Sequence, residues 1–430
     1  MFVDTNQNIV LTNRSVRSSS WNFNSRDLLI LLAFCEKNIV RYVLLVMSMI
    51  PVLADISKLF VPVAYVILIV LTVNRYHYKI GLKETAVLLF ILLSIALTCL
   101  IYPQNSEYIF KPNNFWNVIF PCLKYFIIAL IIIPDRRTLD MIGKASCLAI
   151  VVETAFVFLY MIPRGLLQSD EMSRAYQLLP NILFALNYAF NRKKLLPWIL
   201  SSLGIFYILA MGTRGPIMIL LAFFVIKFLK TVTTKTWIKV ALILMLSCFG
   251  LLIINSNLYM DVLNGLRELF VKLGLSTRII DLTIDGTVIS HLAGRDELYD
   301  IAIRKISERP ILGYGIYGEW QWFQWNAHNM YLEIMLHYGV MVGSALLIWV
   351  FRLIGKTYFS TMNGYARDMI LIWFCFVFIR GIFGGSYLMF GTFFLIGFCI
   401  GEQKRVRTKY YSESNEVKLA LEHKSIINNL

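Results

Sequence analysis

Three short stretches of the chain carry residues whose types and spacing could do chemistry. The first is Gly212-Thr-Arg-Gly-Pro216, which joins one apolar stretch to the next. Pro216 suits the first turn of a helix, and the free backbone N–H groups and positive dipole end of that helix would lie beside Arg214. A helix start of this kind can bind an anion. The alternative is a tight turn whose arginine reaches toward lipid headgroups.

Arg295 is the second candidate for function, because it begins a predicted amphipathic helix. Residues 295–308 place their apolar side chains on one face, and Pro310 ends the helix. The alternative for Arg295 is a surface charge that pairs with Asp296 or with a lipid headgroup.

The third stretch is Ala327-His328-Asn329, at the predicted start of another apolar helix. A histidine near the membrane–water boundary can titrate near neutral pH. The alternative is an interfacial histidine with no role in chemistry. Two other histidines remain candidates: His291 lies in the preceding polar segment, and His337 follows Glu333 by one helical turn.

Apolar stretches long enough to cross a bilayer must position these residues. The 430 residues are 58% hydrophobic and only 16% charged, whereas a soluble domain has about 25% charged residues. The composition excludes a disordered protein, an ordinary nucleic-acid-binding domain and a soluble multidomain enzyme. We therefore predict an all-α polytopic membrane protein, in which the short apolar run 28–35 lies at the interface or leads into the first span. About twelve transmembrane helices are predicted, at residues 38–54, 58–73, 84–102, 115–133, 141–162, 178–190, 195–211, 216–229, 238–254, 330–351, 368–381 and 386–401.

Lys and Arg residues gather in alternate connecting segments, which predicts the orientation of the spans. With the N-terminus inside, the basic segments are all inner ones, and this bias accounts for the formal charge of +15. The predicted organisation is an inner N-terminal segment, nine spans, one large and partly helical outer loop, three more spans and an inner tail. Their limits are residues 1–37, 38–254, 255–329, 330–401 and 402–430.

Several common chemistries have no motif in this sequence. It contains no Walker loop, no HExxH motif and no CxxC pair, and nearly all of its 7 cysteines lie in apolar stretches. ATP-driven transport, a zinc site and a disulfide framework are therefore not indicated. Asp281, Asp285 and Asp296 in the outer loop leave metal binding open, although a metal-dependent enzyme is not favoured.

Two charged residues, Lys124 and Glu153, fall inside predicted spans. Each lies roughly 13 Å below the outer boundary at 1.5 Å per residue, on neighbouring antiparallel helices. Because an isolated charge inside a membrane is costly, we expect them to pair. The alternative is that one of them lines a water-filled cavity.

Four motifs in this order resemble the O-antigen polymerase and ligase superfamily. The large outer loop before the tenth span also fits that superfamily, and the motifs extend over residues 212–343. They are Gly212-Thr-Arg-Gly215, Ala293-Gly-Arg-Asp-Glu-Leu-Tyr299, Glu308-Arg-Pro-Ile-Leu-Gly-Tyr-Gly315, and Ala327-His-Asn-Met-Tyr-Leu-Glu333 with Tyr338-Gly339.

The resemblance implies a membrane-embedded, inverting glycosyltransferase of the C type. Its donor would be a glycan on undecaprenyl pyrophosphate, used at the periplasmic face of the bacterial inner membrane, with both chain termini cytoplasmic. Because the lipid pyrophosphate is already an activated leaving group, we expect neither a cofactor nor a metal ion in the reaction.

The resemblance also assigns roles to individual residues. Arg214 and Arg295 would hold the pyrophosphate and stabilise its developing charge, and His328 would act as a base or orient the acceptor hydroxyl. Arg380, at the outer end of the eleventh span, is a further candidate for the same pocket. The predicted substrate-binding residues are Arg214, Arg295, Arg380, Asn329 and Thr213.

A polymerase is favoured over a ligase on two stretches, Tyr331-Leu-Glu333 and Gly384-Gly-Ser-Tyr387. The polymerase moves the growing glycan onto a lipid-linked repeat unit, whereas the ligase moves it onto lipid A core. A transporter of lipid-linked sugars is the alternative from another class, and the intramembrane charges of Lys124 and Glu153 are its best support. The expected partners are undecaprenyl-pyrophosphate-linked glycans and membrane lipid, with a chain-length regulator protein as a further candidate and no nucleic acid.

Overall fold

The computed structural model describes residues 24–48, 51–76, 80–111, 114, 118–164, 171–231, 257–285, 295–323 and 327–408. Within these ranges all regular structure is helical. Three helical stretches are long and apolar enough to cross a membrane: Leu82–Ile101, Arg136–Arg164 and Met330–Ser360. Shorter apolar helices cover Phe60–Arg75, Phe120–Ile131 and Leu195–Ala210. The chain is therefore a helical membrane protein, and the predicted span 238–254 lies outside the described residues.

The N-terminal helices differ from the predicted spans in their bounds. α1 (Ser25–Cys35) continues through a π-helical turn (Glu36–Val40) into α2 (Arg41–Ser48), and α3 (Pro51–Tyr76) follows. The predicted break between residues 54 and 58 is thus wrong, since α3 is helical there. The run 28–35 does lead into the first long helix: α1 packs on α3, and Leu29 and Ile30 are buried.

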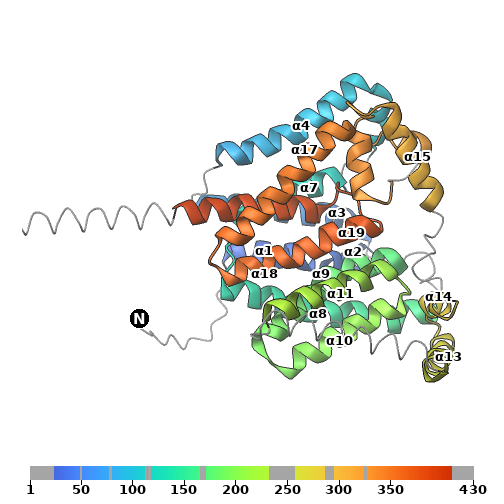
Figure 1. Cartoon of the computed structure of the whole chain (residues 1–430). Helices are drawn as coiled ribbons and strands as arrows, with labels where there is room; N and C mark the ends of the chain where they lie inside the picture. Colours follow the sequence, from blue (N-terminus) through green and yellow to red (C-terminus); the bar gives the residue numbers. More distant parts are fainter. Residues whose placement is uncertain are drawn as a thin grey trace, which may run out of the picture.

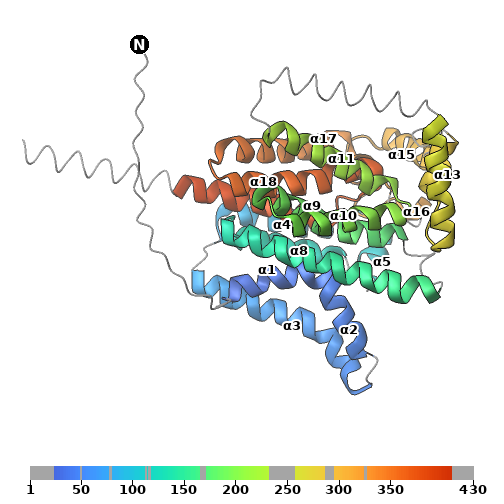
Figure 2. The same cartoon turned by 90° about the horizontal axis from the view of Figure 1, so that it is seen from below.

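The helices form a bundle in which most neighbours run along one common direction (Figures 1 and 2). Its interior is aromatic: the Trp373 and Phe394 rings are tilted against each other with centroids 4.5 Å apart, and Phe34 contacts Phe184 edge-on at 5.0 Å between ring centroids. The other helices of the bundle are α4 (Leu82–Ile101), α5 (Ser106–Ile109), α7 (Phe120–Ile131), α8 (Arg136–Phe156), α9 (Glu171–Arg192), α10 (Leu195–Ala210), α11 (Arg214–Thr231), α17 (Met330–Ser360), α18 (Gly364–Phe374), α19 (Arg380–Phe383) and a last helix at 390–408.

α4 shows how the bundle meets its surroundings. Its leucines are largely exposed, for example Leu93 at 57% and Leu100 at 77%. A row of exposed large apolar side chains on a helix of membrane-spanning length is typical of a surface that faces lipid.

The segment predicted as the outer loop contributes short helices at one end of the bundle, called here the loop end. They are α13 (Asn257–Lys272), α14 (Arg278–Ile284), α15 (Arg295–Glu308) and α16 (Trp320–Phe323). Figure 1 shows α13, α14 and α15 together at the right-hand side. The predicted helix over 295–308 is confirmed.

A break in α17 receives the chain that follows α15. Gly339 has φ 74°, so the helix is interrupted there and leaves the carbonyls of the preceding turn without helical partners. The Leu336 carbonyl accepts from the Tyr314 N–H at 2.7 Å, and the His337 carbonyl accepts from the Gly315 N–H at 3.0 Å. A Cβ on Gly339 would overlap the Ile311 carbonyl, so only glycine allows this close approach. The docking fixes residues 310–323 against α17.

Lys124 and Glu153 do not pair with each other, so that prediction was wrong. Lys124 forms a salt bridge with Glu36 at 2.8 Å, and Glu153 forms one with Arg174 at 3.3 Å. Tyr42 also donates to Glu153 at 2.6 Å. Each intramembrane charge is paired, as expected because an isolated charge in a membrane is energetically costly. The partner, however, lies on a different helix from the one predicted.

Candidate active site

The turn between α10 and α11 places Arg214 at a helix N-terminus. Gly212 has φ 63°, which lets the chain reverse direction before α11 begins at Arg214. The loop after α13 packs against this turn, because a Cβ on Gly212 would lie 3.0 Å from the Ser276 Cβ and 3.6 Å from that of Arg278. The predicted helix start is confirmed, and the structure adds Arg278 beside it.

Arg295 lies at the start of α15 and reaches across to the end of α19. Its Nη1 donates to the Phe383 carbonyl at 2.5 Å. The guanidinium lies beside Gly384, where a Cβ would be 3.5 Å from both terminal nitrogens. Arg295 is also close enough to Arg214 for their charges to interact, as is Arg278.

Arg380 completes the group from the start of α19. Its guanidinium lies over the Tyr176 ring at 4.3 Å and near the Phe376 ring at 5.3 Å. The Tyr176 hydroxyl lies against Gly215, where a Cβ would overlap it. Tyr176 therefore brings Arg380 next to the start of α11, and Arg214, Arg278, Arg295 and Arg380 form what we call the arginine group.

Three members of the arginine group carry positive charge that no described carboxylate balances through a salt bridge. Among the residues that the structure describes, no Asp or Glu forms a salt bridge with Arg278, Arg295 or Arg380. The buried Arg380 Nε also has no hydrogen-bond partner there. Cations gathered at a helix N-terminus are suited to an anion that offers several oxygen atoms.

His328 lies just before α17 with a positive φ of 51° and is partly buried. Burial and the positive charge of Arg295 lower the pKa of its imidazole. A lowered pKa keeps the ring neutral at physiological pH, which is the form that can accept a proton. The structure thus places His328 close enough to Arg295 for its charge to act on the imidazole.

The two remaining predicted site residues, Asn329 and Thr213, differ in whether their side-chain oxygens already accept or donate hydrogen bonds. The Asn329 carboxamide oxygen caps α17 by accepting from the N–H groups of Tyr331 at 3.0 Å and Leu332 at 3.2 Å. Its oxygen is therefore committed to the helix. Thr213 is only 8% exposed, and its hydroxyl has no partner among the described residues.

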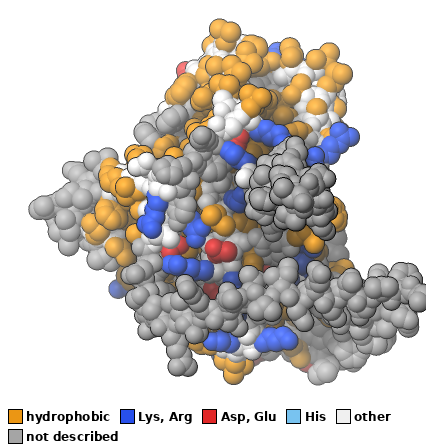
Figure 3. Space-filling view, turned by 90° about the vertical axis from the view of Figure 1, so that its left-hand side faces the viewer, with side chains coloured by type: hydrophobic (Ala, Val, Ile, Leu, Met, Phe, Trp, Pro, Cys, Tyr) orange, Lys and Arg blue, Asp and Glu red, His pale blue; other side chains and the backbone are white. Residues whose placement is uncertain are grey.

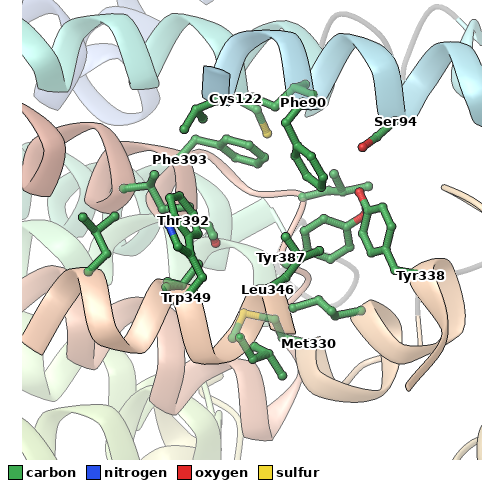
Figure 4. A pocket seen from close by; sticks show the side chains of 18 of the residues that line it. Phe90, Ser94, Cys122, Met330, Tyr338, Leu346, Trp349, Tyr387, Thr392 and Phe393 are labelled. Carbon is green, nitrogen blue, oxygen red and sulfur yellow. The ribbon is translucent and has the colours of Figure 1, made fainter. Parts of the chain in front are cut away.

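A second feature adjoins the arginine group: an apolar groove of about 430 Å³ between α4, α7, α17 and the last helix (Figure 4). At the loop end it begins at Met330, Tyr338 and Tyr387, and toward the opposite end it reaches Leu353 and Ile400. Met330 also packs on Gly381, next to Arg380. The groove therefore starts beside the arginine group and continues along most of the length of α17.

Glu333 connects these two features. Its carboxylate accepts from the Ser386 hydroxyl at 2.7 Å and from the Tyr387 N–H at 3.0 Å. These bonds tie residues 383–387 to α17, and the same segment supplies the Phe383 carbonyl that holds Arg295. Glu333 thereby positions Arg295 without touching it.

Sequence reasoning missed three members of this arrangement: Arg278, Tyr176 and Glu333 in its positioning role. Arg278 and Tyr176 stand in no recognisable motif, so only the fold reveals them. Glu333 had a signal, because it stands one helical turn before His337 on a predicted helix. His291, the other rival to His328, lies outside the described residues.

Comparison with known families gives one match within the chain. Residues 199–348 match the family described as O-antigen ligase. This match over about a third of the chain supports the O-antigen polymerase and ligase superfamily. The match includes Arg214, Arg278, Arg295 and His328, and it confirms the resemblance that the motifs carried. No curated protein and no solved structure matches the chain. Members of that superfamily are enzymes of glycosyltransferase type, and the match supports a function of the polymerase or ligase type for this chain.

Proposed function

We propose that the protein is an O-antigen polymerase that transfers a growing glycan from undecaprenyl pyrophosphate onto a lipid-linked repeat unit. The observation that carries this proposal is the arginine group beside the apolar groove. A lipid pyrophosphate has the matching chemistry: a multiply charged head and a long hydrocarbon tail.

The arginine group would stabilise the leaving group. As the bond between the sugar anomeric carbon and the pyrophosphate oxygen breaks, its electron pair leaves with the pyrophosphate, where negative charge builds. Arg214 and Arg295 can form paired, charge-assisted hydrogen bonds to the phosphate oxygens, and the α11 N-terminus adds its dipole. Stabilising charge that develops only in the transition state raises the rate directly. The guanidinium groups would thus supply the positive charge that a metal ion provides in other transferases.

His328 would serve the acceptor. The hydroxyl oxygen of the acceptor sugar forms the new bond to the anomeric carbon from the side opposite the pyrophosphate, which inverts the configuration. The proton of that hydroxyl passes to the imidazole, which the lowered pKa keeps neutral and ready to accept it. The same ring could instead orient the hydroxyl by hydrogen bonding.

The groove would hold the polyprenyl tail of one lipid-linked substrate. Its wall includes Met330 and Phe378 near the arginine group and continues to Leu353 on α17. A tail lying along it would place the pyrophosphate at the loop end while its isoprene units remain at membrane depth. Each Å² of apolar tail surface buried in the groove would contribute about 25 cal/mol to the free energy of binding.

The distribution of charge supports the membrane orientation that we propose. Figure 3 views the end opposite the loop end, where Lys and Arg side chains are spread over the surface and acidic ones are few. Such a basic end faces the cytoplasm under the positive-inside rule. The loop end, with the arginine group, would then face the periplasm of a bacterial inner membrane. A C-type transferase with about twelve spans and both termini cytoplasmic is the topology that we propose.

A ligase, which would transfer the glycan to lipid A core, is the second candidate, because the family match bears that description. Deleting the gene and analysing the surface polysaccharide separates the two. A core that carries one repeat unit supports the polymerase and any partnership with a chain-length regulator. Accumulated lipid-linked polymer with an unsubstituted core would instead identify a ligase. Loss of all repeat units from the outer leaflet would indicate a transporter.

A further inference from the structure

Behind the groove lies a buried group of three side chains, which we call the acidic–histidine cluster: Glu319, Glu333 and His337. Glu319, Glu333 and His337 are 0%, 2% and 1% exposed, respectively. One ligand atom from each lies within 4.8 Å of those from the other two. The transfer mechanism proposed above uses Glu333 only as a tie for residues 383–387 and has no role for the other two.

The chain builds this cluster from two segments. Glu333 and His337 are four residues apart on α17, so they share one face of the helix. Glu319 arrives from the segment that docks at the break in α17, and its Oε2 lies 2.5 Å from His337 Nε2. The other ring nitrogen, Nδ1, lies 2.7 Å from the Tyr387 hydroxyl.

If both carboxyl groups are ionised, the described side chains leave the charge of the cluster unbalanced. It contains two carboxylates, and no Lys or Arg of the described residues forms a salt bridge with either of them. One protonated imidazole would compensate only one carboxylate. Buried ionised groups persist when they are paired or when they coordinate a metal.

Two buried oxygen atoms at the cluster have no hydrogen-bond partner among the described residues. They are Glu319 Oε1 and the Tyr317 hydroxyl, and Tyr317 is only 5% exposed. Tyr317 lies within electrostatic range of both Glu333 and Glu319. The Glu319–His337 contact leaves Glu319 Oε1 unsatisfied, whereas a cation or its bound water would give that oxygen a partner.

We propose that Glu319, Glu333 and His337 bind one divalent transition-metal ion. Two carboxylate oxygens and one imidazole nitrogen suit zinc or manganese. Metal–ligand bonds of about 2.1 Å require the short Glu319–His337 contact to open by roughly half an ångström or more. The ion would be structural, since its ligands are buried and tie residues 383–387 and 310–323 to α17. It would not contact the transferred sugar.

Metal analysis of the full chain, purified in detergent without chelators, tests this proposal. We expect about one zinc or manganese per chain, falling at least tenfold in Glu319→Gln and in His337→Gln. Glu297→Gln, which changes an exposed carboxylate on α15, is the matched control and should keep the metal. Co²⁺ added to metal-stripped wild-type protein should give a visible absorption band that is typical of mixed oxygen and nitrogen ligands. This measurement does not depend on whether the variants fold.

Two results would overturn the proposal. The first is wild-type protein that holds less than a tenth of a metal per chain and gains no thermal stability from Zn²⁺, Mn²⁺ or Co²⁺. The second is metal that stays in all the cluster variants, because the ion would then be bound elsewhere. Neither result bears on the arginine group, so this proposal and the proposed transfer reaction fail separately.

Discussion

Replacing Arg295 with alanine tests the proposed leaving-group chemistry most directly. The guanidinium lies among three other arginines and is anchored on the Phe383 carbonyl at 2.5 Å. With this anchor made, the remaining N–H groups can reach a phosphate from a fixed position. Arg295→Ala should therefore lower the rate of transfer while the protein still folds, because the side chain is only partly buried.

The size of the loss follows from the neighbours of Arg295. Removing one donor that stabilises developing negative charge costs about 10²- to 10³-fold in kcat, or about 2.7–4 kcal/mol. Arg214, Arg278 and Arg380 remain, and their mutual repulsion falls when Arg295 is lost, so we expect the lower end, about 10²-fold. Arg295→Lys should recover little, since an ammonium cannot hold the Phe383 carbonyl and chelate a phosphate in a planar fork.

The assay is polymer formation from purified lipid-linked repeat units by the full chain in detergent, with kcat and KM measured separately. Because the stabilised charge appears in the transition state, kcat should fall more than donor affinity. Arg304→Ala is the matched control, since Arg304 is an exposed arginine on the same helix. An Arg295→Ala enzyme within threefold of wild type, or a fully active Arg295→Lys enzyme, would refute the assignment.

Three further predictions concern the histidine, the chelator and an intramembrane pair. His328→Gln should retain the lipid-linked donor but lose about 10²-fold or more in turnover. Because burial and Arg295 lower the His328 pKa, wild-type activity should decline only as the pH falls below the usual histidine pKa of about 6.5. Brief EDTA treatment should leave transfer unchanged, and a loss that Mg²⁺ restores without any change in Tm would place a metal at the reaction. Arg174→Met should cost roughly 3–5 kcal/mol of stability, measured by thermal unfolding, and adding Glu153→Gln should recover most of it; additive losses would contradict the pairing.

The sequence predicted the helical membrane class, but not every helix boundary. Hydrophobic periodicity identified α15 to the residue, since its ends are marked by Arg295 and Pro310. The first helices were misread because α1, the π-helical turn and α2 form one continuous helical segment whose polar residues resembled a connecting loop. The predicted inner segment 1–37 includes Glu36, which the structure shows to be the partner of Lys124.

In the candidate site, too, local sequence patterns identify some residues, whereas others are placed only by contacts between distant segments. Arg214, Arg295 and His328 stand at element starts, and local rules for helix termini identify such positions. Arg278 and Tyr176 join them only through packing between helices distant in the chain. Their sequence surroundings carry no motif, so no local pattern could have placed them. The Tyr176 contact with Gly215 is a property of how α9 crosses α11.

The charges inside the bundle explain why depth alone does not identify a partner. Residue counting placed Lys124 and Glu153 at similar depths on neighbouring helices, but depth fixes only one of two coordinates. The other is the rotation of each helix about its axis, and that rotation depends on which face packs against the bundle. Lys124 faces the π-helical turn after α1 and reaches Glu36, whereas Glu153 faces α9 and reaches Arg174. The cost of an unpaired charge in the membrane guarantees that a partner exists, and tertiary packing decides which residue it is.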